Sequence, residues 1–431
     1  MGTTRFTLAL GALVFVSLFG SLLDAASIPS SVKGLDYRSL IIYLKRNPDY
    51  SPNGPAEYAR ALRKWGAKVP EQLIKSLAAM AGAHGHPSKG EEGELGDVPA
   101  VSIRNDREYL SPVGFGTPVQ WLNLDLDTGS ADVWIYTTDT HPYVAQSRDH
   151  VFRINESSTA EKVHNTTWWI TYGDGSSAYG GVYRDVVTLA NITVHNATVE
   201  SAISVSNSLI QDPYMDGIFG LAYRLPVQTS PKQPTVLSSL LPLLNEPLFT
   251  VDLRWRSPDG VYTFGYIDHE RHSGHIKYTS LLPGAQFWEL EYTGIHVEGQ
   301  DRWYKSTQIP WRAIVDTGTT LILMPQDVSD LYFSDVPNAM FNESIGGVWT
   351  YPCNNPVLPD FEISFDSGFI ARIPGKYMNY TNMPDNPKVC MGGLQGWDDS
   401  GRAIFGDVFL KAVYTVFDVG QGRVGFAPKK F

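Results

Sequence analysis

Two Asp-Thr-Gly triplets, each placed directly behind an apolar run, constrain this chain most strongly. They lie in LDLDTGSADVW (124–134) and in AIVDTGTTLILMP (313–325). A carboxylate among apolar residues costs free energy unless other groups compensate its charge. One triplet alone would indicate an ordinary strand-end turn, because Asp and Gly are common in turns. Two copies in matching contexts predict that the fold brings two carboxylates, Asp127 and Asp316, to one place.

A second pair of motifs repeats at nearly the same distance from each triplet. DGIFGLA (216–222) follows the first triplet, and AIFGDVF (403–409) follows the second. Each half therefore contains an apolar strand, the triplet and a later apolar-apolar-Gly element. A duplicated β lobe explains this pattern, and we expect the joint near residues 268–278.

The residue pattern changes near residue 100, from helical spacing to strand alternation. Beyond it, alternating Val, Ile, Tyr and Phe are broken by glycine-containing turns, which predicts a mostly β fold. Before it, residues 54–66 and 70–82 show helical spacing, and the glycine-rich stretch 82–100 is typical of a connector open to cleavage. We therefore expect a signal peptide at 1–25, a partly helical segment at 26–98, an N-terminal lobe at 99–275 and a C-terminal lobe at 276–431.

Charge is distributed unevenly between these parts. Residues 27–90 contain ten Lys and Arg against four Asp and Glu, whereas residues 91–431 contain 23 against 40. A basic front segment and an acidic body predict complementary surfaces, one of which covers the other. The acidic body argues against nucleic acid as a partner.

The first residues have the layout of a secretory signal. Arg5 precedes an apolar stretch from Phe6 to Leu23, and small residues follow, which places cleavage after Ala25. The alternative is an uncut signal anchor. No other stretch is long and apolar enough to span a bilayer, so we expect no membrane partner after signal cleavage. Secretion is the expected destination, with the vacuole as the alternative, because both routes use the same signal.

Two further features agree with export. Cys353 and Cys390 are the only cysteines, which suits one disulfide in an oxidising compartment. Six Asn-x-Ser/Thr sequons are candidate glycosylation sites, at Asn155, Asn165, Asn191, Asn196, Asn342 and Asn379.

The duplicated triplets predict a specific chemistry. Thr in each triplet can anchor its hydroxyl on the opposite lobe, Gly lets the backbones approach closely, and Ser130 and Thr319 can each donate to their own aspartate. Two facing carboxyls share one proton, because both cannot comfortably ionise. One then acts as a base toward water and the other as an acid toward a carbonyl oxygen. Such a pair hydrolyses amides without a metal or a covalent intermediate.

From about residue 105 to its end, the chain resembles pepsin-like aspartic endopeptidases, most of all the secreted fungal members of the aspergillopepsin and penicillopepsin type. The resemblance is specific because five motifs occur in order: DTGSADVW, YGDGSSAYGG, DGIFGLA, DTGTTLILMP and AIFGDVFLKAVYTVFD. It implies two pseudo-symmetric β lobes with a substrate cleft between them. It also implies a partly helical propeptide in front.

The resemblance implies roles around that cleft. TYGDGSS (171–177) resembles the flap, a hairpin that closes over substrate, with Gly173 at a mobile turn. Tyr172 would cover the cleft, and Trp134 would hydrogen-bond its hydroxyl. Asp174 resembles members that accept lysine before the cut, whereas Tyr179 departs from the usual Ser. The other implied substrate-binding residues are Gly129, Ser130, Gly318, Thr319 and Thr320.

The resemblance also implies an inhibitory front segment. RKWG (63–66) resembles the Lys-Tyr pair of the family, with Trp65 in place of tyrosine and Lys64 inserted between the two carboxylates. Acid would protonate carboxylates of the body and release this segment. Cys353 and Cys390 match the single disulfide of the second lobe.

Taken together, these features predict a secreted aspartic endopeptidase made as a zymogen. We expect it to be a monomer that acts on proteins and peptides at acidic pH, with large apolar residues preferred around the cut. No cofactor and no metal are expected, since the ten histidines form no His-x-x-x-His or Cys/His cluster. The alternative is a catalytically inactive peptide-binding or inhibitor protein on the same fold. A glycosidase would predict two unlike acidic sites instead of a duplicated triplet.

Overall fold

The computed structural model describes most of the chain beyond residue 39. The described residues are 40–43, 45–46, 53–82, 109–146, 148, 150–171, 177–210, 214–257, 260–305, 310–354, 357–397 and 401–430. The expected signal peptide, nearly all of the connector and the flap residues Tyr172, Gly173 and Asp174 lie outside them.

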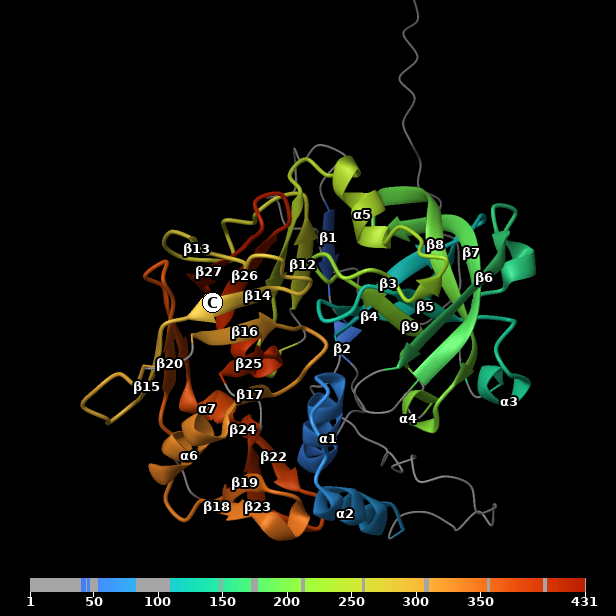
Figure 1. Ribbon diagram of the computed structural model, residues 1–431. Helices are drawn as coiled ribbons and strands as arrows, with labels where there is room; N and C mark the ends of the chain where they lie inside the picture. Colours follow the sequence, from blue (N-terminus) through green and yellow to red (C-terminus); the bar gives the residue numbers. More distant parts are fainter. Residues whose placement is uncertain are drawn as a thin grey trace, which may run out of the picture. The chain divides into compact units, whose positions relative to one another are not determined.

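A nine-stranded sheet forms the first half of the body (Figure 1). Its order is β10 (Thr229–Ser230), β6 (Glu161–Thr171), β7 (Ser177–Leu189), β8 (Ile192–Val205), β5 (Val133–Tyr136), β9 (Gly217–Gly220), β4 (Gln120–Asp127), β3 (Tyr109–Phe115) and β2 (Lys45–Arg46). Asp127 is the last residue of β4 and pairs in register with Gly220 of β9.

The second half repeats the centre of that sheet. Its five-stranded sheet has the order β14 (Glu289–Tyr292), β16 (Trp311–Val315), β25 (Arg402–Phe405), β17 (Ile322–Pro325) and β24 (Leu394–Trp397). In the first half, β4 pairs parallel with β9, β9 antiparallel with β5, and β5 parallel with β8. The strands β16, β25, β17 and β24 pair in the same way. The predicted duplication and the mostly β fold are therefore confirmed.

A six-stranded sheet joins the halves. Its order is β1 (Leu40–Tyr43), β12 (Val261–Phe264), β11 (Leu248–Asp252), β26 (Val413–Asp418), β27 (Arg423–Pro428) and β13 (Lys277–Ser280). Phe249 of β11 stacks on Phe417 of β26 at 4.7 Å between ring centroids, and Trp288 packs on both rings. Burial of these large rings gives the halves a continuous apolar core.

Two smaller sheets complete the second half. One contains β15 (Gly294–Val297), β20 (Phe361–Ser364) and β21 (Ile370–Ile373). The other contains β18 (Met340–Asn342), β19 (Val348–Pro352), β23 (Asn386–Gly392) and β22 (Asn379–Met383). The disulfide between Cys353 and Cys390 is present, with 5.0 Å between the Cα atoms, and it links the end of β19 to β23. The expected pairing is confirmed.

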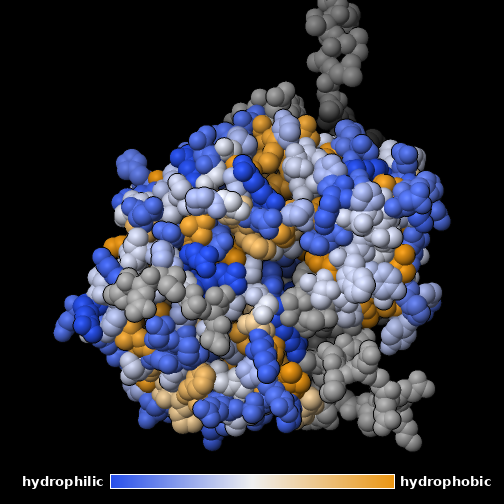
Figure 2. Space-filling view, in the orientation of Figure 1, coloured by the Kyte–Doolittle hydropathy of each residue, from blue (hydrophilic) through white to orange (hydrophobic). Residues whose placement is uncertain are grey.

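Short helices connect these strands. They are α3 (Pro142–Ala145), α4 (Asn207–Ile210), α5 (Val236–Leu240), α6 (Gln326–Ser334), α7 (Gly375–Met378) and α8 (Asp407–Leu410), with 3-10 turns η2 (Ile154–Glu156), η3 (Leu241–Leu243) and η4 (Glu343–Ile345). None of the described helices is both long and apolar enough to cross a bilayer. On the face shown in Figure 2, apolar residues occur in small groups among polar ones.

The front segment forms two helices where the sequence predicts them, α1 (Gly54–Lys64) and α2 (Glu71–Gly82). Asn53 caps α1 by accepting from the backbone N–H of Ala56, and Gly66 follows the helix with φ 75°. Tyr58, Leu62 and Leu73 are buried in one apolar cluster with Leu321 and Ile404 of the second half. The two described helices of the front segment are thus packed against the second half through apolar side chains.

Candidate active site

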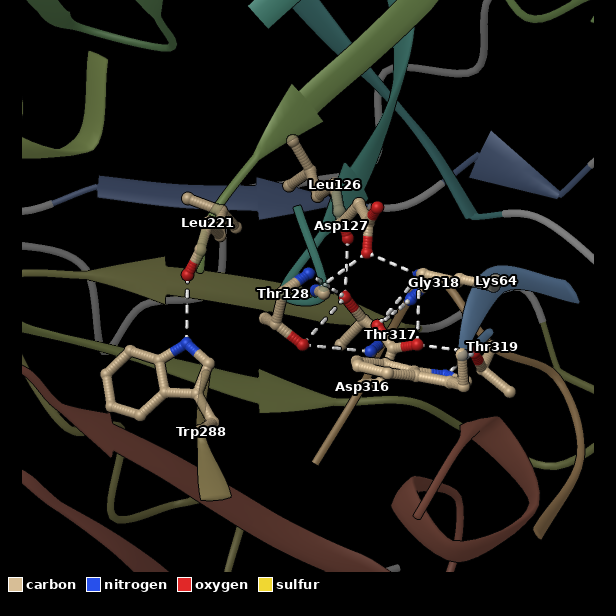
Figure 3. Close-up of polar contacts among 12 residues, drawn as sticks. Lys64, Leu126, Asp127, Thr128, Leu221, Trp288, Asp316, Thr317, Gly318 and Thr319 are labelled. Carbon is tan, nitrogen blue, oxygen red and sulfur yellow. Dashed lines mark hydrogen bonds and ion pairs between the residues drawn. The ribbon is translucent and has the colours of Figure 1, made fainter. Parts of the chain in front are cut away.

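Asp127 ends β4 and Asp316 follows the matching strand β16, and their carboxyls approach the Lys64 ammonium from opposite sides (Figure 3). The two threonines that follow them bind the halves to each other. Thr128 Oγ1 donates to the carbonyl of Val315 at 3.0 Å, and Thr317 Oγ1 donates to the carbonyl of Leu126 at 2.6 Å. Each hydroxyl also accepts the backbone N–H of the other threonine.

The glycines of the triplets are required by the close approach of the two carboxyls. Gly129 N–H donates to Asp127 Oδ1 at 2.8 Å, and Gly318 N–H donates to Asp316 Oδ1 at 3.1 Å. A Cβ on Gly129 would lie 2.5 Å from Asp316 Oδ1, and a Cβ on Gly318 would meet Asp127 Oδ1. Any larger residue would therefore push the carboxyls apart.

The residues after the two glycines differ in their contacts. Thr319 donates its hydroxyl to Asp316 Oδ2, as the sequence predicts. Ser130 is buried beside Asp127. Its hydroxyl nevertheless makes no hydrogen bond of ordinary geometry within the described part of the chain. The expected symmetric pair of donors is therefore present on one side only, at Thr319.

Lys64, the last residue of α1, lies between the two carboxyls. Its Nζ is 2.8 Å from Asp127 Oδ1, 3.0 Å from Asp316 Oδ1 and 2.9 Å from Asp316 Oδ2. The Lys64 side chain is 10% exposed, so water screens this ion pair little. The next residue, Trp65, donates its indole N–H to Thr319 Oγ1 at 3.3 Å.

The electrostatics of the three groups follow from burial and charge. Burial by itself would raise the pKa of Asp127, but the Lys64 ammonium and its hydrogen bond bring that pKa below its ordinary value. Burial raises the pKa of Asp316 to about 6, and Lys64 offsets only part of this effect. Burial would lower the pKa of Lys64, but the two carboxylates raise it. The pKa of Asp127 is therefore lowered and that of Asp316 is raised, as in an acid–base pair.

A cavity of about 630 Å³ opens beside this pair. Gly129 and Ser130 of the first triplet line it, together with Lys64 and Trp65 of the front segment. The other lining residues are Asp132, Trp169, Ile170, Thr171, Leu225, Gln228, Phe287 and Arg402. Its walls thus combine strands of both halves, as a substrate site between lobes requires.

The structure places the remaining predicted residues as follows. Trp134 is fully buried and stacks on Trp168, whereas its expected partner Tyr172 lies outside the described residues, as do Gly173 and Asp174. Thr320 Oγ1 donates to Glu57 Oε2 of α1 at 3.3 Å. The sequon residues Asn155, Asn165, Asn191 and Asn196 are exposed, and Asn342 and Asn379 are half-buried.

Sequence reasoning missed three buried acids near the site. Burial raises the pKa of Asp125 to about 7, and the charge of Asp127 adds to this effect. The segment LDLD (124–127) could have predicted this, because Asp125 and Asp127 are alternate residues of one strand and therefore point to the same side. Burial also raises the pKa values of Asp132 and Glu200, and the charge of Asp132 adds to the effect at Glu200. No sequence signal pairs these two residues. Within the described ranges, no group of three His, Cys, Asp or Glu side chains is placed to hold a metal.

Comparison with known proteins agrees with this geometry. The family model for eukaryotic aspartyl protease matches residues 108–429. Aspergillopepsin-1 of Aspergillus flavus is 37% identical over 86% of this chain and 86% of its own length. Endothiapepsin of Cryphonectria parasitica is 37% identical over 89% of each chain. Aspergillopepsin-1 of Aspergillus clavatus is 36% identical over 96% of this chain and 98% of its own length. This chain therefore belongs to the eukaryotic aspartyl protease family and is an aspartic endopeptidase.

Proposed function

We propose that this chain is the zymogen of a secreted endopeptidase that cuts internal peptide bonds of proteins in acid, with Asp127 and Asp316 as its catalytic pair. The observation that carries the proposal is the position of Lys64 Nζ, 2.8 and 3.0 Å from Oδ1 of the two carboxyls. A cation there fills the space in which a water molecule and a peptide carbonyl would meet.

The chemistry follows once Lys64 has left. One carboxyl is ionised and takes a proton from water while the water oxygen attacks the peptide carbonyl carbon. The other carboxyl is protonated and donates its proton to the carbonyl oxygen, which gives a tetrahedral diol. The leaving nitrogen then takes a proton from the pair, the C–N bond breaks, and a carboxylic acid and an amine are released. The reaction requires the pair to hold one proton, so the enzyme is active at acidic pH.

The front segment holds several groups of the body that a peptide would otherwise engage. Trp65 occupies the hydroxyl of Thr319, and Glu57 occupies the hydroxyl of Thr320. Tyr58 donates its hydroxyl to the carbonyl of Gly396 at 2.5 Å. These contacts support residues 26–98 as an inhibitory propeptide, followed by catalytic lobes at 99–275 and 276–431. The flap residues Tyr172, Gly173 and Asp174 keep their proposed roles over the cleft, and Gly318 and Thr319 bind the substrate backbone.

Acid weakens the inhibitory contact between Lys64 and the two carboxyls. The Lys64 ion pair holds the pKa of Asp127 below its ordinary value, so the stability that it contributes is present at higher pH and is lost as pH falls through that lowered pKa. Asp316, with its pKa of about 6, takes up a proton earlier and leaves Lys64 with one charged partner. The front segment is therefore released on acidification, after removal of residues 1–25 during export.

The test is activity of carboxamide variants on denatured globin near pH 4. Asp127→Asn and Asp316→Asn should each lower the proteolytic activity at least about a thousandfold, because the two carboxyls act as one unit. Asp366→Asn is the matched control, since Asp366 is exposed in the turn between β20 and β21. The inactive peptide-binding alternative predicts that the unaltered, processed chain cuts no globin at all. Sequencing the N-terminus of the acid-treated protein locates the processing point.

A further inference from the structure

Two solvent-exposed aromatic side chains lie opposite each other on β6 and β7. Trp169 is 66% exposed and Tyr179 is 50% exposed, and the two residues are direct partners in the strand register. Their ring centroids are 6.5 Å apart. The neighbours Trp168 and Ile170 point the other way and are buried, so strand alternation places Trp169 on the outer face. Aromatic pairs directly opposite each other on neighbouring strands stabilise one another's position.

Trp169 is also one wall of the cavity beside Asp127. Its indole N–H donates to Thr171 Oγ1 at 2.8 Å, and Thr171 lines the same cavity. This hydrogen bond and the Tyr179 ring restrict the indole to one side of the strand. Leu225 and Phe287 contribute apolar surface elsewhere in the lining.

The front segment shows what this cavity accepts. Trp65 lines it as well, and its ring lies edge-on to Phe287 at 5.2 Å between centroids. An aromatic side chain one residue from Lys64 is thus already seated against the cavity wall next to the two carboxyls. When the front segment leaves, Phe287 loses this partner and the cavity loses both Lys64 and Trp65 from its lining.

We propose that Trp169 is a specificity-determining residue: with Phe287 it forms a subsite for a large aromatic side chain of the peptide substrate, at one position beside the scissile bond. Tyr179 is a positioning residue that holds the indole. This inference rests on the proposed function of the same site. The occupant is an aromatic residue because Trp65 provides that chemistry in the zymogen, and because aromatic rings favour edge-on or offset contacts with Trp and Phe.

The experiment uses the acid-processed enzyme and peptides that carry Trp, Phe or Ala at each position around one cleavable bond. At one peptide position, the unaltered enzyme should have a higher kcat/KM for an aromatic residue than for Ala. Trp169→Ser should reduce this ratio about tenfold, as expected for the loss of one ring contact. Trp169→Phe should retain most of the preference. Tyr179→Ser should weaken the same preference by about threefold. Trp121→Ser is the matched control, because Trp121 is 48% exposed and does not line the cavity.

Two results would overturn the inference. One is an unchanged preference in Trp169→Ser, and the other is an equal loss at every peptide position with a lowered melting temperature, which indicates a structural role. Calorimetry of the same peptides binding to the Asp316→Asn protein gives a second readout, after an added protease has cut the connector at residues 82–100 and acid has released the front segment. If the unaltered enzyme cuts no peptide, the proposed function fails, and this binding series still decides whether Trp169 selects aromatic residues.

Discussion

Thr128 and Thr317 exchange hydrogen bonds across the two halves of the body, each backbone N–H donating to the other hydroxyl at 3.0 and 2.9 Å. Each hydroxyl also donates to a backbone carbonyl of the opposite half. All these groups are buried, so water cannot replace a lost partner. The separation of Asp127 and Asp316 is therefore set by a closed network between the halves.

Removing one hydroxyl from this network should reduce both stability and activity. Thr128→Val leaves the Thr317 N–H and the Val315 carbonyl without their partner, at about 1–3 kcal/mol for each buried group. The carboxyls should also shift, and a misplacement of about 1 Å can cost on the order of a hundredfold in rate. Denaturant unfolding and kcat measure the two effects. Thr350→Val, at a buried threonine that bonds the carbonyl of Met340, should leave kcat unchanged. A normal kcat in Thr128→Val would contradict the network's role.

Latency should depend on the single ammonium of Lys64. In Lys64→Met the two carboxyls lose the charge that holds the front segment, and breaking a buried ion pair typically costs about 3–5 kcal/mol. Progress curves of the full chain at pH 5 should show a lag for the unaltered protein and almost no lag for the variant. Lys68→Met, at an exposed lysine beyond α1, should keep the lag. A lag of full length in Lys64→Met would show that other contacts maintain latency.

Glu200 should make the fold less stable as pH rises. Burial raises the pKa of Glu200 well above its ordinary value, and the charge of the neighbouring Asp132 adds to this effect. The unfolded chain releases the Glu200 proton near pH 4, whereas the folded chain keeps it, so stability falls with increasing pH above about 4. Glu200→Gln removes the titrating carboxyl at nearly the same side-chain size, and should narrow the difference in melting temperature between pH 4 and pH 7.

The matched control for that pH series is Glu161→Gln. Glu161 is exposed on β6, so its substitution should leave the difference between the two melting temperatures unchanged. Each kcal/mol of stability corresponds to roughly 2–4 °C in a domain of about 150–250 residues, which thermal unfolding measures readily. An equally large difference in Glu200→Gln would show that other buried acids control the pH dependence.

The six sequons should differ in occupancy. Asn155, Asn165, Asn191 and Asn196 are exposed and can carry a glycan without displacing neighbours. Asn379 is half-buried and accepts a hydrogen bond from the Tyr351 hydroxyl at 3.1 Å, and Asn342 caps η4 by accepting from Ser344. Peptide mass spectrometry should therefore find the first four occupied and the last two largely bare. Full occupancy of Asn379 would contradict this order.

The sequence by itself determined the local features and the repeat. The duplicated triplets predict the matched strands, because each apolar run before an Asp must pair inside a sheet. The spacing of Tyr58 and Leu62 predicts the buried face of α1, since residues four apart share one side of a helix. With only two cysteines, the pairing of Cys353 and Cys390 has no competitor.

Only the tertiary structure decided which charged and aromatic groups meet. Arg63, Lys64 and Lys68 are equally cationic in the sequence, yet the docking of α1 brings Lys64 to both aspartates. Packing of distant strands also decides that Asp132 lies near Glu200 and that Trp169 lies beside the cavity. The physical reason is that desolvation and charge coupling act over a few ångströms of space, whatever the separation along the chain.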